Sequence, residues 1–193
     1  KTAEVAMLQD LLIWTLKGIS WWGVNGRGMG VTDERTDLFI AEALFATITN
    51  ANFDDARFVS LIRESLERRD ALREAAQTKC ETLHGKPCFH ALPEAATWQP
   101  QDWERSTLLT KAAQVGIMAD PDLDEDIRSL REMLTIGLKG MAAYLDHAYV
   151  LDHHDENVLA FLQEGLLATI NDNLSVDDLV GWVVRCGQVG AQA

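Results

Sequence analysis

The spacing of apolar residues along this chain is that of α-helices. Four early leucines recur at intervals of three and four residues and so share one face of a helix: Leu8, Leu11, Leu12 and Leu16. A second helix is predicted over about 33–49, with Thr32 or Asp33 as its N-cap, and a third from about residue 54. Alternation with a period of two residues, the pattern of a half-buried strand, is nearly absent. We therefore predict an all-α protein.

A near-copy of the first helix returns later in the chain. The phrase LQDLLIWTLKG, near the start, reappears as LREMLTIGLKG at Leu130. An offset of 122 residues aligns residues 8–63 with residues 130–185 without a gap, and 15 aligned pairs are identical, Gly18 and Gly140 among them. About four identities would arise by chance in a stretch of this length. A duplicated three-helix unit explains the match.

The repeat divides the chain into three regions. Residues 1–72 are predicted to form a first three-helix bundle, and residues 127–193 a second one. Residues 73–126 form a proline-containing connector, whose one strong helical pattern lies near 102–115. The predicted architecture is two pseudo-repeated three-helix bundles joined by a connector with one extra helix. Because the chain starts with lysine rather than methionine, we expect it to be one structural domain of a longer protein.

The acidic composition excludes several classes of partner. The chain has 193 residues, enough for a buried core, and its 30 acidic against 17 basic side chains give a formal net charge of −13 at pH 7. This charge repels DNA, RNA and anionic membrane surfaces, so we expect no nucleic acid and no membrane as partners. Three widely spaced cysteines do not suggest a disulfide framework, and no signal peptide or membrane span is recognisable. We expect a cytoplasmic protein.

One glycine-rich stretch invites comparison with a phosphate-binding loop. GVNGRGMG occupies Gly23–Gly30. Dinucleotide fingerprints need a strand before the glycines and a helix after them, whereas here a helix precedes them. We interpret the stretch as a loosened helix end or loop.

The connector holds the one cluster that resembles a metal site. Cys80, His84, Cys88 and His90 are residue types that bind zinc, but the spacing C-x3-H-x3-C-x-H matches none of the common zinc patterns. We interpret them as incidental residues, with a small zinc carrier as the alternative. Glu81 and His84 form a lone E-x-x-H, whereas a di-iron bundle needs two such pairs.

No other residues point to catalysis. Three histidines and three aspartates near the end of the fifth predicted helix indicate a solvated helix end: His147, His153, His154, Asp146, Asp152 and Asp155. Four tryptophans on or near apolar faces are interpreted as core or interface packing: Trp14, Trp21, Trp22 and Trp182. No Ser/His/Asp set, G-x-S-x-G or C-x-x-C is present, which argues against nucleophilic and thiol redox mechanisms. We assign no catalytic, cofactor-binding or metal residue in this chain.

Several long motifs occur in the order found in a known family. LQDLLIWTLKGIS, ALFATITNANFDDARF, LPEAATW, IRSLREMLTIGLKGMAAY and LSVDDLV together resemble the hybrid-cluster proteins, also called prismane proteins or hydroxylamine reductases, and look closest to the sulfate-reducer type. The similarity extends from the first residues to about Cys186. It covers the N-terminal helical domain of a longer protein, which in this family consists of two three-helix bundles lying roughly perpendicular. The stretch VNGRGMG departs from the family, whose members tend to have a regular helix there.

The resemblance implies cofactors that other segments of the parent protein would hold. Family members carry a cysteine-ligated 4Fe-4S cluster, whose motif would lie just before Lys1. They also carry a hybrid 4Fe-2S-2O cluster, whose His, Glu and Cys ligands would follow the end of this chain. None of these ligands maps onto Cys80, Cys88 or Cys186.

The expected function follows from the same resemblance. The parent would be an oxidoreductase that reduces hydroxylamine to ammonia and water, with nitric oxide as a rival substrate, and this domain would pack against and shield the clusters. The expected partners are the remaining domains, a small nitrogen-oxide substrate and an electron donor protein, and the chain alone is expected to be inactive. A non-catalytic helical-repeat interaction module is the alternative.

Overall fold

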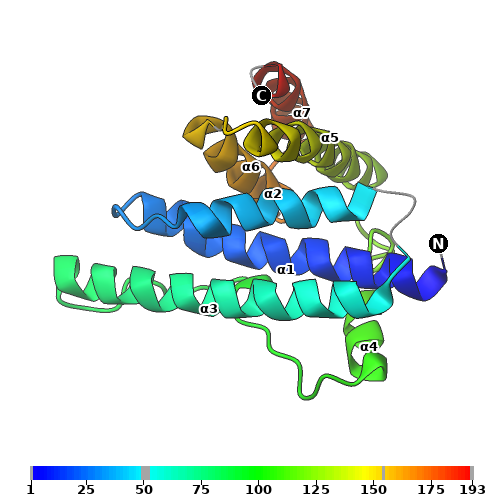
Figure 1. Cartoon of the computed structure of the whole chain (residues 1–193), viewed down its shortest axis with the longest axis horizontal. Coiled ribbons are helices and arrows are strands. Elements are labelled where there is room, and N and C mark those ends of the chain that lie inside the picture. The colour runs from blue at the N-terminus through cyan, green and yellow to red at the C-terminus, as the bar shows by residue number, and fades with distance from the viewer. Residues whose placement is uncertain (1, 49–52, 154, 192–193) are drawn as a thin grey trace. The chain divides into compact units, whose positions relative to one another are not determined.

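The protein is all-helical, as predicted. The computed structural model describes residues 2–48, 53–153 and 155–191. Within these ranges the chain forms seven α-helices, one short 3-10 helix and no strand (Figure 1). The elements in chain order are α1 (Ala3–Arg27), α2 (Glu34–Ile48), α3 (Asp55–His84), η1 (Glu94–Ala96), α4 (Arg105–Val115), α5 (Glu125–Val150), α6 (Glu156–Ala168) and α7 (Val176–Gly190).

Short polar side chains fix where several helices begin. Thr2 accepts a hydrogen bond from the backbone N–H of Val5 at the start of α1, and Asp33 accepts one from Arg35 at the start of α2. Asp33 therefore acts as the cap that the sequence offered together with Thr32. At the start of α7, Ser175 and Asp178 cap each other's backbone N–H groups. The hydrogen bond that the Ser175 hydroxyl donates to the Asp178 carboxylate, and after it the bond from the Ser175 backbone N–H, lower the pKa of that carboxyl.

The helix starts keep the spacing of the sequence repeat. Helix α5 begins 122 residues after α1, α6 begins 122 residues after α2, and α7 begins 121 residues after α3. The starts of each pair thus agree with the 122-residue offset of the repeat to within one residue. The duplication itself stays a prediction that this spacing supports.

The chain divides into two compact units. The first comprises Lys1–Thr36 and Phe53–Gly116, and the second Asp37–Asn52 and Ile117–Ala193. Most of α2 is thus grouped with the later helices, although the sequence boundaries place it in 1–72. Those boundaries stay predictions about folding units, because a grouping by contacts does not report which segments fold on their own.

Helix α1 is the centre of the first unit. It packs along α3 (Figure 1). It also packs against η1 and α4. Its buried face includes the four leucines that the pattern predicted, followed by Ile19 and Trp22, all without exposed surface. Phe58 and Ile62 of α3 are equally buried. The predicted apolar stripe of the first helix is therefore a core face.

The second unit is built around α5, which packs against α6 and α7. Glycines permit two close approaches: a Cβ at Gly137 would lie 3.0 Å from the Cys186 sulfur, and one at Gly165 would lie 2.6 Å from a Leu138 methyl carbon. Asp37 of α2 accepts a hydrogen bond from Gln163 of α6. Within the described segments, no helix combines the length and apolar composition that a membrane crossing requires.

Two helices are longer than the sequence suggested. Helix α1 continues through Gly23 and Gly26, both buried, and ends at Arg27, so only Gly28–Gly30 lie outside it. The expectation that the whole glycine-rich stretch loosens is therefore wrong. Helix α3 continues past residue 73 to His84, where Gly85 ends it with a left-handed backbone (φ +66°).

Candidate functional site

In the first unit, the segment that follows α3 returns across α1 and is held there by side chains of α1 and α3. We call residues 86–98 the return segment. Near its start, the Phe89 ring meets Trp21 and Trp22 of α1 edge-to-face, with ring centroids 5.5 and 5.1 Å apart. Trp21 and Trp22 therefore make the packing contacts expected of them, and the Phe89 ring against which they pack belongs to the predicted connector.

The end of the return segment lies directly on the backbone of α1. The indole N–H of Trp22 donates a hydrogen bond of 2.9 Å to the carbonyl oxygen of Ala96. A Cβ at Gly18 would lie only 2.0 Å from the carbonyl oxygen of Ala95. Gly18 is thus required for this approach, which leaves no room for a side chain.

A fully buried arginine holds the same segment from the side of α3. The Arg69 side chain has no exposed surface and donates hydrogen bonds to the carbonyl oxygens of Trp98 (2.5 Å) and Ala95 (3.3 Å). It also donates to Asp70 at 2.8 Å, and Asp70 accepts a bond from Gln99. Burial lowers the pKa of Arg69, against the opposing effect of the Asp70 carboxylate. The buried positive charge of Arg69 is therefore compensated by the neighbouring Asp70 carboxylate.

A second cation is enclosed by aromatic rings. Lys111 of α4 is 7% exposed, and its Nζ lies 4.6 Å from the Trp14 ring centroid and 5.9 Å from that of Trp98. The same Nζ donates a hydrogen bond of 2.5 Å to the carboxylate of Glu94. Trp14 and Trp98 also meet edge-to-face, with centroids 5.7 Å apart. Helix α4 is thereby fixed to both α1 and the return segment.

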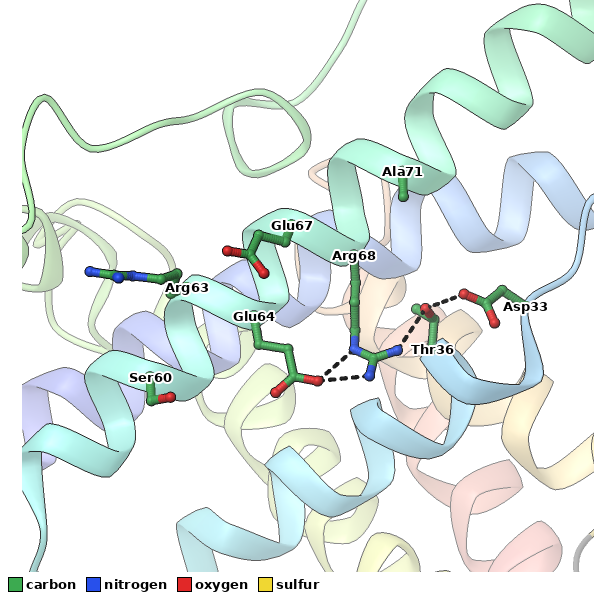
Figure 2. Close-up of a pocket in the computed structure, with 8 residues that line it drawn as sticks. All are labelled: Asp33, Thr36, Ser60, Arg63, Glu64, Glu67, Arg68 and Ala71. Carbon is green, nitrogen blue, oxygen red and sulfur yellow. Dashed lines mark hydrogen bonds and ion pairs between the residues drawn. The ribbon is translucent and has the colours of Figure 1, made fainter.

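An open groove of about 560 Å³ runs between α3 and the start of α2. Its lining is Asp33, Thr36, Ser60, Arg63, Glu64, Glu67, Arg68 and Ala71. Figure 2 shows the Arg68 guanidinium between Glu64 and Thr36: it donates two hydrogen bonds to Glu64, at 2.9 and 2.7 Å, and Thr36 in turn donates to Asp33. The Arg63 guanidinium stacks on Trp103, 4.4 Å from the ring centroid. The groove thus has paired charges of both signs and offers no concentrated field for a charged ligand.

The structure brings together two of the four residues Cys80, His84, Cys88 and His90, which the sequence offered as a metal site only in the alternative interpretation. Cys80 and Cys88 form a disulfide, with Cα atoms 6.1 Å apart, whereas His84 and His90 are exposed. The interpretation of these cysteines as incidental residues is therefore wrong. The left-handed turn at Gly85 reverses the chain, and this reversal brings residues eight positions apart within bonding range.

The described histidines near the end of α5 and Trp182 have the surroundings that the sequence predicted, a solvated helix end and an apolar packing contact. His147 and His153 are exposed around the end of α5, and the His147 ring contacts Phe45 with centroids 5.6 Å apart. His154 lies outside the described residues. Trp182 packs against Phe161, and Arg185 stacks on both rings. Glu81 and His84 are both exposed at the end of α3.

The described residues do not fit an iron–sulfur cluster. Such a cluster is held by several converging thiolates or imidazoles. Within residues 2–48, 53–153 and 155–191, no three His, Cys, Asp or Glu side chains converge as metal ligands would. Cys80 and Cys88 are bonded to each other, and Cys186 is buried against Gly137. Burial raises the pKa of the Cys186 thiol, which disfavours the thiolate that a metal would bind.

Comparison with known proteins agrees with the motifs. The model of the Prismane/CO dehydrogenase family matches residues 1–193, the whole chain. The chain belongs to this family. The resemblance drawn from the sequence motifs is thereby confirmed.

Relatives within the prismane family carry the name hydroxylamine reductase. The protein of Petrotoga mobilis is 44% identical over 193 residues, which are 100% of this chain and 35% of the relative. The protein of Natranaerobius thermophilus is 45% identical over 98% of this chain and 34% of the relative. That of Desulfitobacterium hafniense is 47% identical over 98% of this chain and 33% of its own length. The chain thus spans about a third of the curated relatives it matches.

Sequence reasoning missed the residues that assemble the return segment. Arg69 lies in the charged run ERRDALREA, whose composition is typical of a solvated helix face, and Lys111 lies in the predicted connector helix. Their positions offered a signal, since both occur among apolar residues at helical spacing: Leu66 and Leu72 around Arg69, and Leu108 and Ala112 around Lys111.

Proposed function

We propose that this chain is the helical domain of a hydroxylamine reductase, and that it packs against and shields iron–sulfur clusters whose ligands belong to other segments of the parent protein. The reaction proposed for the parent is NH2OH + 2 H⁺ + 2 e⁻ → NH3 + H2O. The observation that carries the proposal is the match of the entire chain, at 44–47% identity, to proteins named hydroxylamine reductase.

The packing of the first unit supports a role as a rigid wall. Iron–sulfur chemistry depends on burial and on restricted access of water. In this unit the return segment is fixed by Trp22 and Arg69, and α4 is fixed by Lys111. Side chains and backbone are thus held from several directions, as a supporting wall requires.

The proposal assigns the chemistry to the rest of the parent protein. The relatives are about three times as long as this chain, so they contain further domains that can supply cluster ligands and a substrate site. We propose those domains, a small nitrogen-oxide substrate and an electron donor protein as partners. We also propose that the parent acts in the cytoplasm.

Anaerobic turnover of the complete gene product tests the proposal. Reduced methyl viologen should be oxidised on addition of hydroxylamine, with ammonia formed in equal amount to the hydroxylamine consumed. The 193-residue chain alone, under the same conditions, should show no turnover. A complete product that holds no iron and does not consume hydroxylamine would contradict the proposal and favour a non-catalytic helical module.

A further inference from the structure

The disulfide at the end of α3 joins a buried sulfur to an accessible one. Cys80 has no exposed surface and lies on the inner face of α3, whereas Cys88 is half-buried in the return segment. The residues between them, 81–87, are all exposed. A soluble thiol can therefore reach the bond from the side of Cys88.

The disulfide lies beside the contacts that hold the first half of the return segment. The sulfurs of Cys80 and Cys88 lie 3.6 and 3.7 Å from the carbonyl oxygen of Lys86. Phe89, the next residue, packs against Trp21 and Trp22. The disulfide and the contact of the Cys80 sulfur connect residues 86–92 to α3, and the Phe89 ring connects them to α1.

The second half of the segment is attached independently of the disulfide. Ala95, Ala96 and Trp98 accept hydrogen bonds from Arg69 and Trp22, and none of these bonds involves a cysteine. Breaking the disulfide would therefore remove one attachment of residues 86–92 and leave the hydrogen bonds of residues 94–98 intact. Residues 94–98 therefore serve as an internal control for any effect of the disulfide on residues 86–92.

We propose that Cys80 and Cys88 are a reversible thiol–disulfide couple that controls the docking of residues 86–92 on α1. The oxidised pair holds the segment in place and keeps Phe89 packed against Trp21 and Trp22. The reduced pair releases it. A disulfide that closes a ring of so few residues restricts the unfolded chain less than a disulfide between distant segments would, and its direct effect is confined to the residues beside it.

The exchange reaction balances with a dithiol as reductant. A thiolate of the dithiol attacks the accessible Cys88 sulfur, the S–S bond breaks, and Cys80 leaves as a thiolate that takes up a proton. The second thiol of the reductant then attacks the mixed disulfide and releases Cys88. Two electrons and two protons pass to the protein, and the reductant becomes a cyclic disulfide.

One tryptic peptide of the complete gene product reports the redox state of this pair alone. Trypsin cuts after Lys79 and Arg105 but not after Lys86, because Pro87 follows it, so the peptide 80–105 contains both cysteines and no other. The protein is equilibrated anaerobically in dithiol–disulfide buffers, acid-quenched and alkylated. We expect a single two-electron transition from the unlabelled to the doubly labelled peptide.

Hydrogen exchange of the same samples tests the coupling to docking. Reduction should speed amide exchange in residues 86–92 by at least about tenfold and leave residues 94–98 unchanged. Cys88→Ser should show the fast exchange in every buffer, whereas the control Cys186→Ser should behave as the unmodified protein. Phe89→Ala should keep the redox transition but lose the effect of oxidation on exchange.

The proposal stands apart from the proposed reductase activity, because neither measurement uses turnover. It is overturned if peptide 80–105 stays a dithiol in the most oxidising buffer or a disulfide in the most reducing one. It is equally overturned if exchange of residues 86–92 is the same in both redox states.

Discussion

Trp22 of α1 donates a 2.9 Å hydrogen bond from its indole nitrogen to the carbonyl oxygen of Ala96, 74 residues further along the chain. The indole has no exposed surface, and Ala96 has none either. The bond therefore ties the first helix to a segment that the sequence identified only as a connector. Ala95 and Ala96 of this segment are part of the core of the first unit.

Trp22→Phe should destabilise the first unit by about 2–4 kcal/mol. The change removes the indole donor from a buried carbonyl and leaves a cavity beside Phe89. Urea denaturation of the chain measures the loss. Trp103→Phe is the matched control, because Trp103 is 36% exposed and its replacement should cost less than about 1 kcal/mol. Equal losses in the two variants would show that the Trp22 bond contributes nothing.

Gly18 and Gly140 should respond oppositely to the same substitution. A Cβ at Gly18 would lie 2.0 Å from the Ala95 oxygen, whereas nothing lies within 4 Å of a Cβ at Gly140. Gly18→Ala should therefore destabilise the chain by about 2–4 kcal/mol. Gly140→Ala should stabilise it by about 0.5–1 kcal/mol, because alanine favours a helix interior. Thermal or urea unfolding of both variants checks the signs, and destabilisation of similar size at both positions would refute the contrast.

These two glycines mark what the sequence could predict. Both occupy the same place in the repeated LKG phrase, and the repeat indicated helices there correctly. The phrase cannot reveal that Gly18 meets the return segment, because that contact depends on residues nearly 80 positions away. Helices follow from local periodicity, whereas the close approach depends on tertiary structure.

Removing Glu94 should cost more than removing the lysine it pairs with. Glu94→Gln leaves the Lys111 ammonium nearly buried without a carboxylate, and we expect a loss of about 1–2 kcal/mol. Lys111→Met keeps an apolar chain between Trp14 and Trp98 and leaves Glu94 in water, so the change should stay within about 1 kcal/mol. A double-mutant cycle by urea denaturation measures both. The reverse order would mean that the cation–π contacts dominate.

Stability should fall in alkaline solution because of Cys186. Burial raises the pKa of this thiol in the folded chain, so the unfolded state loses the proton first as the pH rises. The contribution of this group is fully present below the usual thiol pKa of about 9 and is lost as the pH rises through the folded value. Unfolding measured anaerobically at neutral pH and at about pH 10 should show a smaller loss for Cys186→Ala than for the unmodified chain. An identical loss would contradict the assignment.

The candidate site was less predictable than the fold. The sequence identified Cys80 and Cys88 as close neighbours in the chain but gave no sign that they pair, because this depends on the turn at Gly85. The burial of Arg69 and Lys111 was not predictable for a different reason. Charged residues are almost always exposed, and a charge is stable in the interior only where partners offset the loss of its hydration. Apart from Asp70, which follows Arg69 on α3, those partners are the carbonyls of the return segment and Glu94, which lie outside the helix that carries each cation.

The iron content of the chain expressed alone, compared with that of the complete gene product, tests the central claim most directly. Both are purified anaerobically, with iron supplied during expression, and visible absorption is recorded beside the iron analysis. Our account predicts a folded, helical, colourless and iron-free chain, and a coloured complete product with bound iron. Stoichiometric iron and visible absorption in the isolated chain would contradict it, because the cluster ligands would then lie within these residues.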